Sequence, residues 1–356
     1  MYASIKAIEY YLPPGVLTNE ELAPLFPGRS PEELAQKTGV VERRMSAPGD
    51  CSSDLGVAAA RKLFEKAGYS PSDFDFVLLC TQTPDYFLPA TACLVQARLG
   101  IPTSAGAFDF NLGCSGYIYG LGLAKALVEN GQARRLLLIT ADTVGRLANP
   151  IDRATRALFG DAATATVIEA SAGSMELGPF LYGTDGSGAE NLITHEGAFR
   201  YFASQDTNAL NGGNGSNGEY NGRPLVHMNG SKIVDFSMGT VPPMLQELFR
   251  RAGVTMPEID LFVFHQASNY ILEMLRSTLR IPREKYYISM SHTGNTAAST
   301  IPIALRNAHE EGRLAPGNKI VLAGFGVGLS WGATLVCWAG LRRAEPCSQN
   351  VSKSAG

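Results

Sequence analysis

The feature that most constrains the fold of this 356-residue chain is an internal repeat. Residues 63–80 read LFEKAGYSPSDFDFVLLC and residues 248–265 read LFRRAGVTMPEIDLFVFH, with five identities at an offset of 185. Each copy contains the end of a helix, a glycine stop, a proline-containing loop and a short apolar run. An apolar run of about 4–8 residues is typical of a strand that is buried on both faces.

A second pair of segments extends the repeat. Residues 113–131, GCSGYIYGLGLAKALVENG, match residues 294–312, GNTAASTIPIALRNAHEEG, at an offset of 181. Each copy begins with glycine and a small polar residue, continues as an apolar helix and ends at a glycine cap. Strands are expected to follow at 136–140 and 319–323. Strands and helices that alternate in two copies predict an α/β fold with mostly parallel or mixed five-stranded sheets and helices in layers.

The repeat also suggests how the chain is divided. We expect two pseudo-symmetric halves at 1–170 and 171–342, followed by a polar tail at 343–356. Residues 205–223, QDTNALNGGNGSNGEYNGR, are rich in Asn and Gly and have no apolar periodicity. They predict an exposed loop, either a tolerated surface insertion, which we favour, or a lid over a site.

Charge and composition exclude several classes of function. The chain has 30 Lys and Arg against 33 Asp and Glu, so no basic excess is available to neutralise a nucleic-acid backbone. No stretch approaches the roughly 18 apolar residues of a membrane span, and the N-terminus does not resemble a secretion signal. Six Cys without a CxxC pair indicate no disulfide framework, so we expect a cytoplasmic protein.

Cys114 is the strongest candidate nucleophile. It follows the apolar run 105–112 and opens a helix, which places its sulfur beside unpaired N–H groups and the positive end of the helix dipole. This environment favours the thiolate. Gly113 and Gly116 leave room for a substrate. The alternative is a thiol that only packs in the core.

The repeat identifies partners for this thiol. Asn295 matches Cys114, and His265 matches Cys80. Corresponding loops of a duplicated fold meet where strands end, which is where open α/β sheets carry their sites. Histidine is the usual proton acceptor for a thiol near neutral pH. A lone His that ends an apolar run is more often a core residue, but the pairing with Cys114 favours a function.

The glycine-rich segment 324–332, GFGVGLSWG, is not a nucleotide loop. It reads GxGxG rather than GxGxxG, and only 24 residues follow it. The backbone N–H groups of Gly326, Val327 and Gly328 could instead stabilise the oxyanion of a thioester intermediate. The alternative is a tight turn between two strands. No Cys and His cluster has metal spacing, so no metal site is expected.

Together these motifs resemble the β-ketoacyl-acyl carrier protein synthase III (FabH-like) family of the thiolase fold. The resemblance covers residues 5–340. The motifs that carry it are KTGVVERR (37–44), TQTPDYFLPATAC (81–93), NLGCSGYIYGL (111–121), DRATRALFGDAATA (152–165), HQAS (265–268), GNTAAS (294–299) and GFGVGLSWGA (324–333).

The resemblance implies a homodimeric acyltransferase that needs no cofactor. Cys114 would be acylated by acyl-CoA or an acyl carrier protein, and His265 and Asn295 would assist decarboxylative condensation with malonyl-CoA or a malonyl carrier protein. The Cys114 amide and the Gly326–Gly328 turn would stabilise the oxyanion. The product would be a β-ketoacyl thioester for fatty acid, polyketide or related biosynthesis.

The donor-binding residues depart from the family pattern. Lys37 replaces an Arg that helps to bind coenzyme A, and Glu33 replaces an aromatic residue that stacks on adenine. Tyr270 replaces an Arg that docks the carrier protein, and Ser268 replaces the Asn of HQAN. Arg153 is retained. The expected donor-binding residues are therefore Lys37, Leu88, Arg153 and Ser268.

Two other functions stay open. The same acyl-Cys could pass its acyl group to a hydroxyl or an amine without decarboxylation, although the presence of Asn295 argues mildly against this. A non-catalytic partner subunit is the second alternative, and the intact set Cys114, His265 and Asn295 argues against it.

Overall fold

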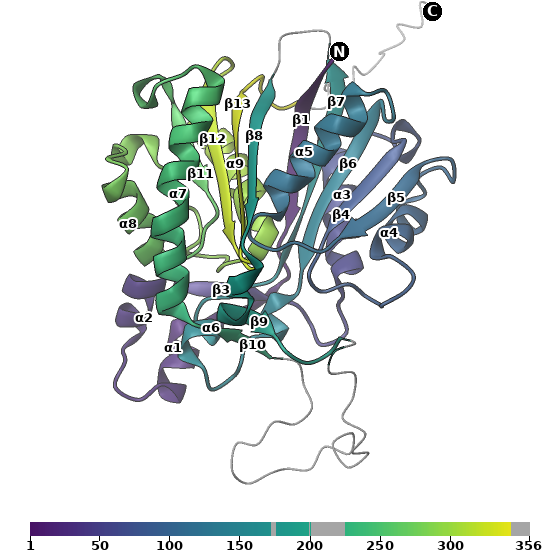
Figure 1. Ribbon diagram of the computed structural model, residues 1–356. Coiled ribbons are helices and arrows are strands. Elements are labelled where there is room, and N and C mark those ends of the chain that lie inside the picture. The colour runs from purple at the N-terminus through teal and green to yellow at the C-terminus, as the bar shows by residue number, and fades with distance from the viewer. Residues whose placement is uncertain (172–175, 199, 201–224, 343–356) are drawn as a thin grey trace, which may run out of the picture.

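The computed structural model describes residues 1–171, 176–198, 200 and 225–342 (Figure 1). The Asn/Gly-rich segment 205–223 and the tail 343–356 lie outside the described residues, so their predicted roles stay predictions.

One five-stranded sheet is built from the N-terminal part of the chain. Its strand order is β1-β7-β6-β4-β5. Strand β4 runs parallel to β5 and β6, whereas β7 is antiparallel to both β1 and β6. The strands are β1 (Tyr2–Tyr11), β4 (Phe76–Cys80), β5 (Gly106–Phe110), β6 (Arg135–Asp142) and β7 (Ala162–Ser171).

A second sheet is built from the C-terminal part, in the order β11-β12-β13-β8. Only β11 and β12 are parallel, and the other neighbours are antiparallel. Both sheets are therefore mixed rather than mostly parallel. The strands are β8 (Leu177–Thr184), β11 (Leu261–Phe264), β12 (Lys319–Gly326) and β13 (Ser330–Cys337).

Within the described residues this second sheet has four strands instead of the five that we expected. The fifth position holds one isolated parallel bridge between Phe262 and Tyr286. The Tyr287 N–H still bonds to the Phe262 carbonyl, at 3.0 Å. The next ladder position is lost because the Ser289 N–H bonds to the side-chain oxygen of Gln266 instead of to the neighbouring strand.

The helices form three layers around the two sheets (Figure 1). α5 and α9 pack between the sheets, in one apolar cluster with residues of β4, β6, β11 and β12. α3 and α4 cover the outer face of the first sheet, and α7 and α8 cover that of the second. The helices are α3 (Ser52–Ala67), α4 (Thr91–Leu99), α5 (Gly116–Glu129), α7 (Gly230–Ala252), α8 (Asn269–Thr278) and α9 (Thr300–Glu310).

Shorter elements lie at the end of the molecule where the labels α1, α2, α6 and β3 gather in Figure 1. They are α1 (Asn19–Leu22), α2 (Pro31–Thr38), α6 (Arg153–Arg156), β2 (Gly15–Thr18), β3 (Glu42–Met45), β9 (Leu192–Thr194) and β10 (Val226–Met228). No helix in the described ranges is long and apolar enough to cross a membrane.

The two copies of the repeat fold alike. α3 ends at Gly68 and α7 ends at Gly253, and both glycines are left-handed, with φ of 68° and 64°. A left-handed residue after a helix is favourable for glycine because glycine has no Cβ. Each cap is followed, after a one-turn 3₁₀ helix, by an apolar strand, β4 or β11.

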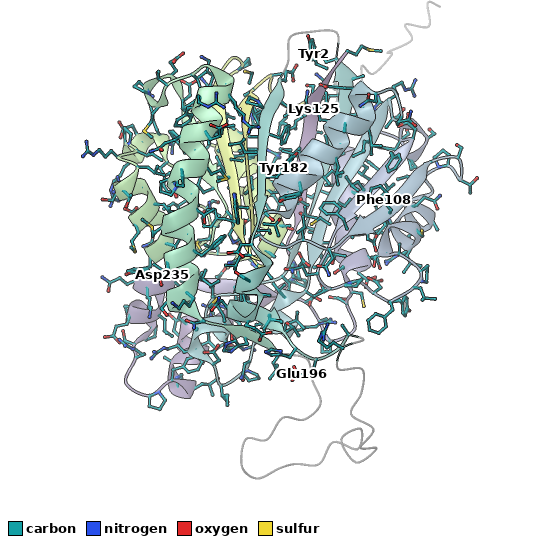
Figure 2. All side chains as sticks on the ribbon, in the orientation of Figure 1. Tyr2, Phe108, Lys125, Tyr182, Glu196 and Asp235 are labelled. Carbon is teal, nitrogen blue, oxygen red and sulfur yellow. The ribbon has the colours of Figure 1, made fainter. Side chains whose placement is uncertain are left out.

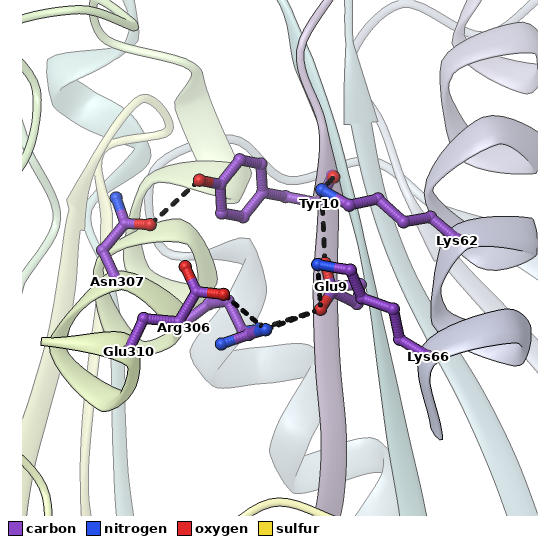
Figure 3. A network of polar contacts seen from close by, with 7 residues as sticks. All are labelled: Glu9, Tyr10, Lys62, Lys66, Arg306, Asn307 and Glu310. Carbon is purple, nitrogen blue, oxygen red and sulfur yellow. Dashed lines mark hydrogen bonds and ion pairs between the residues drawn. The ribbon is translucent and has the colours of Figure 1, made fainter. Parts of the chain in front are cut away.

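A buried carboxylate on β1 connects the outer helix α3 with the inner helix α9 (Figure 3). Glu9 of β1 accepts two hydrogen bonds from the guanidinium of Arg306 in α9, at 2.8 and 3.0 Å. Lys62 and Lys66 of α3 each lie 3.3 Å from the same carboxylate. A buried charge needs such partners, and here they connect the outer helix, the edge strand and the inner helix.

Candidate active site

Cys114, His265 and Asn295 all line one cavity of about 1300 Å³. All three side chains are buried. Cys114 lies just before α5, His265 directly follows β11, and Asn295 precedes α9. The structure therefore brings together the three residues that the repeat selected.

Backbone bonds between distant segments fix these positions. The His265 N–H donates to the Ala323 carbonyl at 2.7 Å, which extends the β11–β12 ladder by one residue. The Asn295 N–H donates to the Leu158 carbonyl at 2.9 Å, and the Gly160 N–H donates to the Asn295 carbonyl at 3.0 Å. The Asn295 backbone is thus clamped by the segment that leads into β7 of the other sheet.

The expectation that Cys114 favours the thiolate is wrong for the free protein. Burial raises the pKa of its thiol to about 11, and the charge of Asp142 adds a smaller increase. The backbone N–H groups of Val327 and of Cys114 itself bond to the sulfur and lower the pKa, but burial outweighs them. α5 begins only at Gly116, two residues further on.

The same two amides are candidates for an oxyanion hole. The N–H groups of Cys114 and Val327 both bond to the sulfur, so they lie beside the atom to which a thioester carbon would bond. Gly326 lies so close that an added Cβ would be 2.6 Å from the Cys114 sulfur. Gly328 has a φ of 138°, which L side chains rarely adopt. The turn between β12 and β13 therefore requires glycine.

His265 is a neutral imidazole in this cavity, because burial lowers its pKa to about 3. Its Nδ1 lies 2.8 Å from the Thr300 hydroxyl, and its Nε2 lies 3.5 Å from the Asn295 amide nitrogen. Asn295 donates to the Ala267 carbonyl at 3.2 Å and accepts from the Ala297 N–H at 3.0 Å. These bonds fix both side chains.

Three of the four expected donor-binding residues lie along the same cavity. Lys37 of α2, Arg153 of α6 and Ser268 all contribute to its lining. Ser268 also caps α8, because its hydroxyl accepts the Ile271 N–H at 3.4 Å. Leu88 does not line this cavity, and its side chain is 82% exposed on the loop before α4.

Two residues close to the site were missed at the level of sequence. Thr300 lies five positions after Asn295 in the segment 294–300, GNTAAST. Nothing in the sequence distinguishes it from the small polar residues around it. Asp142 ends β6 and is completely buried, and its charge acts on Cys114. A carboxylate at the end of an apolar strand was the available signal.

No group of three or more His, Cys, Asp and Glu in the described part of the chain could hold a metal ion.

Comparison with family models identifies two matching segments. Residues 108–186 match the model described as 3-oxoacyl-[acyl-carrier-protein (ACP)] synthase III, and residues 249–338 match the model of its C-terminal part.

Similar full-length proteins carry the same description. The chain is 36% identical over 338 residues to the β-ketoacyl-[acyl-carrier-protein] synthase III of Caldanaerobacter subterraneus subsp. tengcongensis, covering 95% of this chain and 98% of that protein. It is also 36% identical to the synthase of the same name from Chlamydia caviae, covering 94% and 96%.

Solved structures agree with the sequence comparisons. A crystal structure of a 3-oxoacyl-(acyl-carrier-protein) synthase III superposes with a TM-score of 0.88 at 46% identity, covering 95% of this chain and all of that one. The priming β-ketosynthase of the R1128 polyketide pathway superposes with a TM-score of 0.84 at 27% identity, covering 95% and 97%.

Proposed function

The chain belongs to the β-ketoacyl-[acyl-carrier-protein] synthase III family of the thiolase fold, and on this premise we propose that Cys114 is the residue that carries the acyl group. The enzyme is a transferase that condenses an acyl-Cys with a malonyl thioester and releases carbon dioxide. The observation that carries the assignment is the cavity in which Cys114, His265 and Asn295 meet under the amides of Cys114 and Val327.

In the first half-reaction the Cys114 sulfur attacks the carbonyl carbon of an acyl thioester. The oxygen becomes an oxyanion, which the N–H groups of Cys114 and Val327 stabilise. Removing one such donor typically costs about 10²–10³ in rate. The bond to the leaving thiolate then breaks, and the acyl group stays on Cys114.

In the second half-reaction a malonyl thioester loses its carboxylate as carbon dioxide. The electron pair of the broken bond moves into an enolate, whose carbon attacks the acyl-Cys carbonyl and releases the Cys114 thiolate. Asn295 can offer an amide N–H to the enolate oxygen, because only one of its two protons is tightly held, at the Ala267 carbonyl. His265 lies in the same cavity, with its Nε2 3.5 Å from the Asn295 amide nitrogen.

The thioester donors would enter past a cavity rim that differs from the usual pattern. Lys37 keeps a positive charge but lacks the planar fork that grips phosphate in two places, and the Tyr270 side chain is 52% exposed where a charge is common. Neighbouring basic residues such as Arg153 and Arg276 are the alternative source of positive charge, although Glu273 and the Ile281 carbonyl already bind the Arg276 guanidinium. We therefore propose a dedicated carrier or an unusual acyl donor rather than acetyl-CoA priming, with no cofactor.

We also propose a homodimer whose two copies pair along the free edge of the first sheet. β5 is the last strand of that sheet, and Phe108 projects from it (Figure 2). The loop before α4 also exposes three apolar side chains: Tyr86, Phe87 and Leu88. Edge strands of this kind pair readily with a second chain. We also propose that the protein is cytoplasmic.

The proposal is tested with a malonyl thioester labelled in its carboxyl group. With acyl-CoA present, we expect labelled carbon dioxide and β-ketoacyl thioester in a one-to-one ratio. Asn295→Ala should keep the acyl adduct on Cys114 but lose carbon dioxide release. An acyl adduct that only a hydroxyl or amine acceptor discharges would show acyl transfer without decarboxylation.

A further inference from the structure

The Thr300 hydroxyl lies behind the imidazole of His265, on the side away from Asn295. Thr300 is 3% exposed and is not part of the cavity lining, so it does not meet the substrate. Its oxygen is 2.8 Å from His265 Nδ1, and it donates to the Ala297 carbonyl at 3.0 Å.

Counting protons on this side indicates which state of Nδ1 fits the hydrogen bonds. A threonine hydroxyl has one proton, and a backbone carbonyl can only accept. Because the proton of Thr300 goes to the Ala297 carbonyl, its oxygen must accept from the ring. Nδ1 therefore carries a hydrogen.

The other side of the ring gives the same answer independently. The orientation of the Asn295 amide is set by its neighbours, since its oxygen accepts the Ala297 N–H and its nitrogen donates to the Ala267 carbonyl. The amide nitrogen therefore presents its second N–H to Nε2, at 3.5 Å. A donor at this place requires a lone pair on Nε2, not a hydrogen.

We propose that Thr300 is a positioning residue that holds His265 in the Nδ1–H tautomer, so that Nε2 accepts the thiol proton of Cys114 during acylation. The inference rests on the proposed function and adds a role for His265 before condensation. The S–H bond of Cys114 breaks as its sulfur bonds to the acyl carbon. The proton passes to Nε2 and then to the leaving thiolate, which departs as a free thiol.

Proton transfer to His265 compensates for the high pKa of the buried Cys114 thiol. With the pKa of Cys114 near 11, only about one molecule in 10⁴ carries a thiolate at pH 7. A neutral imidazole that lines the same cavity as the thiol can remove the proton as the sulfur attacks, once the 3.5 Å contact between Asn295 and Nε2 gives way. General base catalysis of this kind contributes typically about 10²–10⁴ in rate.

The experiment compares Thr300→Val, which has the same shape without the hydroxyl, with Thr300→Ser, which keeps it. Acylation of Cys114 by acyl-CoA is followed in a single turnover, and carbon dioxide release is followed separately on enzyme that has been acylated first. We expect Thr300→Val to acylate about 10- to 100-fold more slowly at an unchanged KM for acyl-CoA. Thr300→Ser should acylate at close to the wild-type rate, and condensation should change little in both variants.

An equal loss in both half-reactions, or a valine variant that acylates normally, would overturn the proposal. If the valine variant does not fold, ¹⁵N NMR of the histidines in the wild-type enzyme decides, with His265→Gln identifying the signal. The proposal requires Nδ1–H, and an Nε2–H signal would contradict it. A failure of the proposed function itself is recognised separately, because the wild-type enzyme would then form no Cys114 adduct at all.

Discussion

Cys114 and His265 are both uncharged at neutral pH, which distinguishes this site from a thiolate–imidazolium pair. Burial is the main cause at each residue, since it raises the thiol pKa to about 11 and lowers the imidazole pKa to about 3. Reactivity in the free enzyme therefore depends on a small thiolate population, which is why we propose that the proton moves to His265 during attack.

The pH dependence of thiol alkylation tests this description. Since the thiol pKa is raised, the thiolate fraction should grow about tenfold per pH unit between pH 7 and pH 10. The rate of Cys114 alkylation by iodoacetamide, read by peptide mass, should rise in the same way. A rate that levels off near pH 6 or 7 would show a thiolate already present and contradict the description.

Asp142 is a second buried titratable residue next to the site. Its Oδ1 accepts the Gln82 N–H at 2.7 Å, whereas its Oδ2 has no partner among the described residues. Burial raises its pKa to about 7. The folded state thus holds the proton more tightly than the unfolded chain, and stability is lost as the pH rises from about 4 to about 7.

Asp142→Asn should remove this pH-dependent loss. The difference in the free energy of unfolding between the variant and wild type should shift in favour of the variant from pH 5 to pH 8. The shift is at most about 1.4 kcal/mol per pH unit up to pH 7. Urea unfolding of both proteins at the two pH values measures the difference. A constant difference between variant and wild type would contradict the raised pKa.

At this scale the sequence was informative wherever the repeat compared two copies. Cys114, His265 and Asn295 occupy matched positions, and the structure places all three in one cavity. Their roles stay predictions. The charge state of Cys114 was wrongly predicted, because helix position is local whereas burial depends on β12, which is about 200 residues away. Thr300 was missed because a hydrogen bond to an imidazole leaves no spacing pattern.

Among the elements, the end of β12, which leads into the turn to β13, lies directly against Cys114. Its Gly326 has no space for a side chain, because a Cβ would lie 2.6 Å from the Cys114 sulfur and 2.7 Å from the Cys114 Cβ. Such a contact forces the turn or the thiol to move, and with it the Val327 N–H.

Gly326→Ala should therefore lose acylation of Cys114 by at least about 10²-fold, the cost of one displaced oxyanion donor. Gly186→Ala is the matched control, because no atom lies within 4 Å of its added Cβ. Single-turnover acylation and the melting temperature are measured for both. A Gly326→Ala enzyme that acylates at the wild-type rate would remove the turn from the mechanism.

The elements themselves were predictable to different degrees. The strands expected at 136–140 and 319–323 are present and longer, at Arg135–Asp142 and Lys319–Gly326. The fifth strand of the second sheet was not correctly predicted. Residues near Tyr286 have the apolar composition of a strand, but the Gln266 side chain takes the Ser289 N–H, which no local pattern announces.

At the scale of the whole molecule, the repeat and the motifs were sufficient to predict an α/β fold of the thiolase type, and the family comparisons confirm it. The division at 1–170 and 171–342 remains our proposal. The assembly could be inferred only from resemblance, because the sequence does not show that β5 is an edge strand or that Phe108 is exposed.

The proposed dimer predicts a specific dependence on this edge. Wild type should elute at about twice the chain mass of 38.0 kDa in light scattering, and Phe108→Asp should shift the population toward the monomer. Tyr2→Asp changes another exposed aromatic residue, on β1 at the opposite edge of the sheet (Figure 2), and should not. A monomeric wild-type protein, or equal effects of the two changes, would contradict the proposed interface.

The most direct test of the account is the intact mass of the protein after each half-reaction. Incubation with a panel of acyl-CoA thioesters should add one acyl group to wild type, and subsequent malonyl thioester should return the mass to its starting value. Cys114→Ala, although folded, should gain no acyl group. Acylation that survives in Cys114→Ala would contradict the account, and so would a wild-type adduct that malonyl thioester leaves in place.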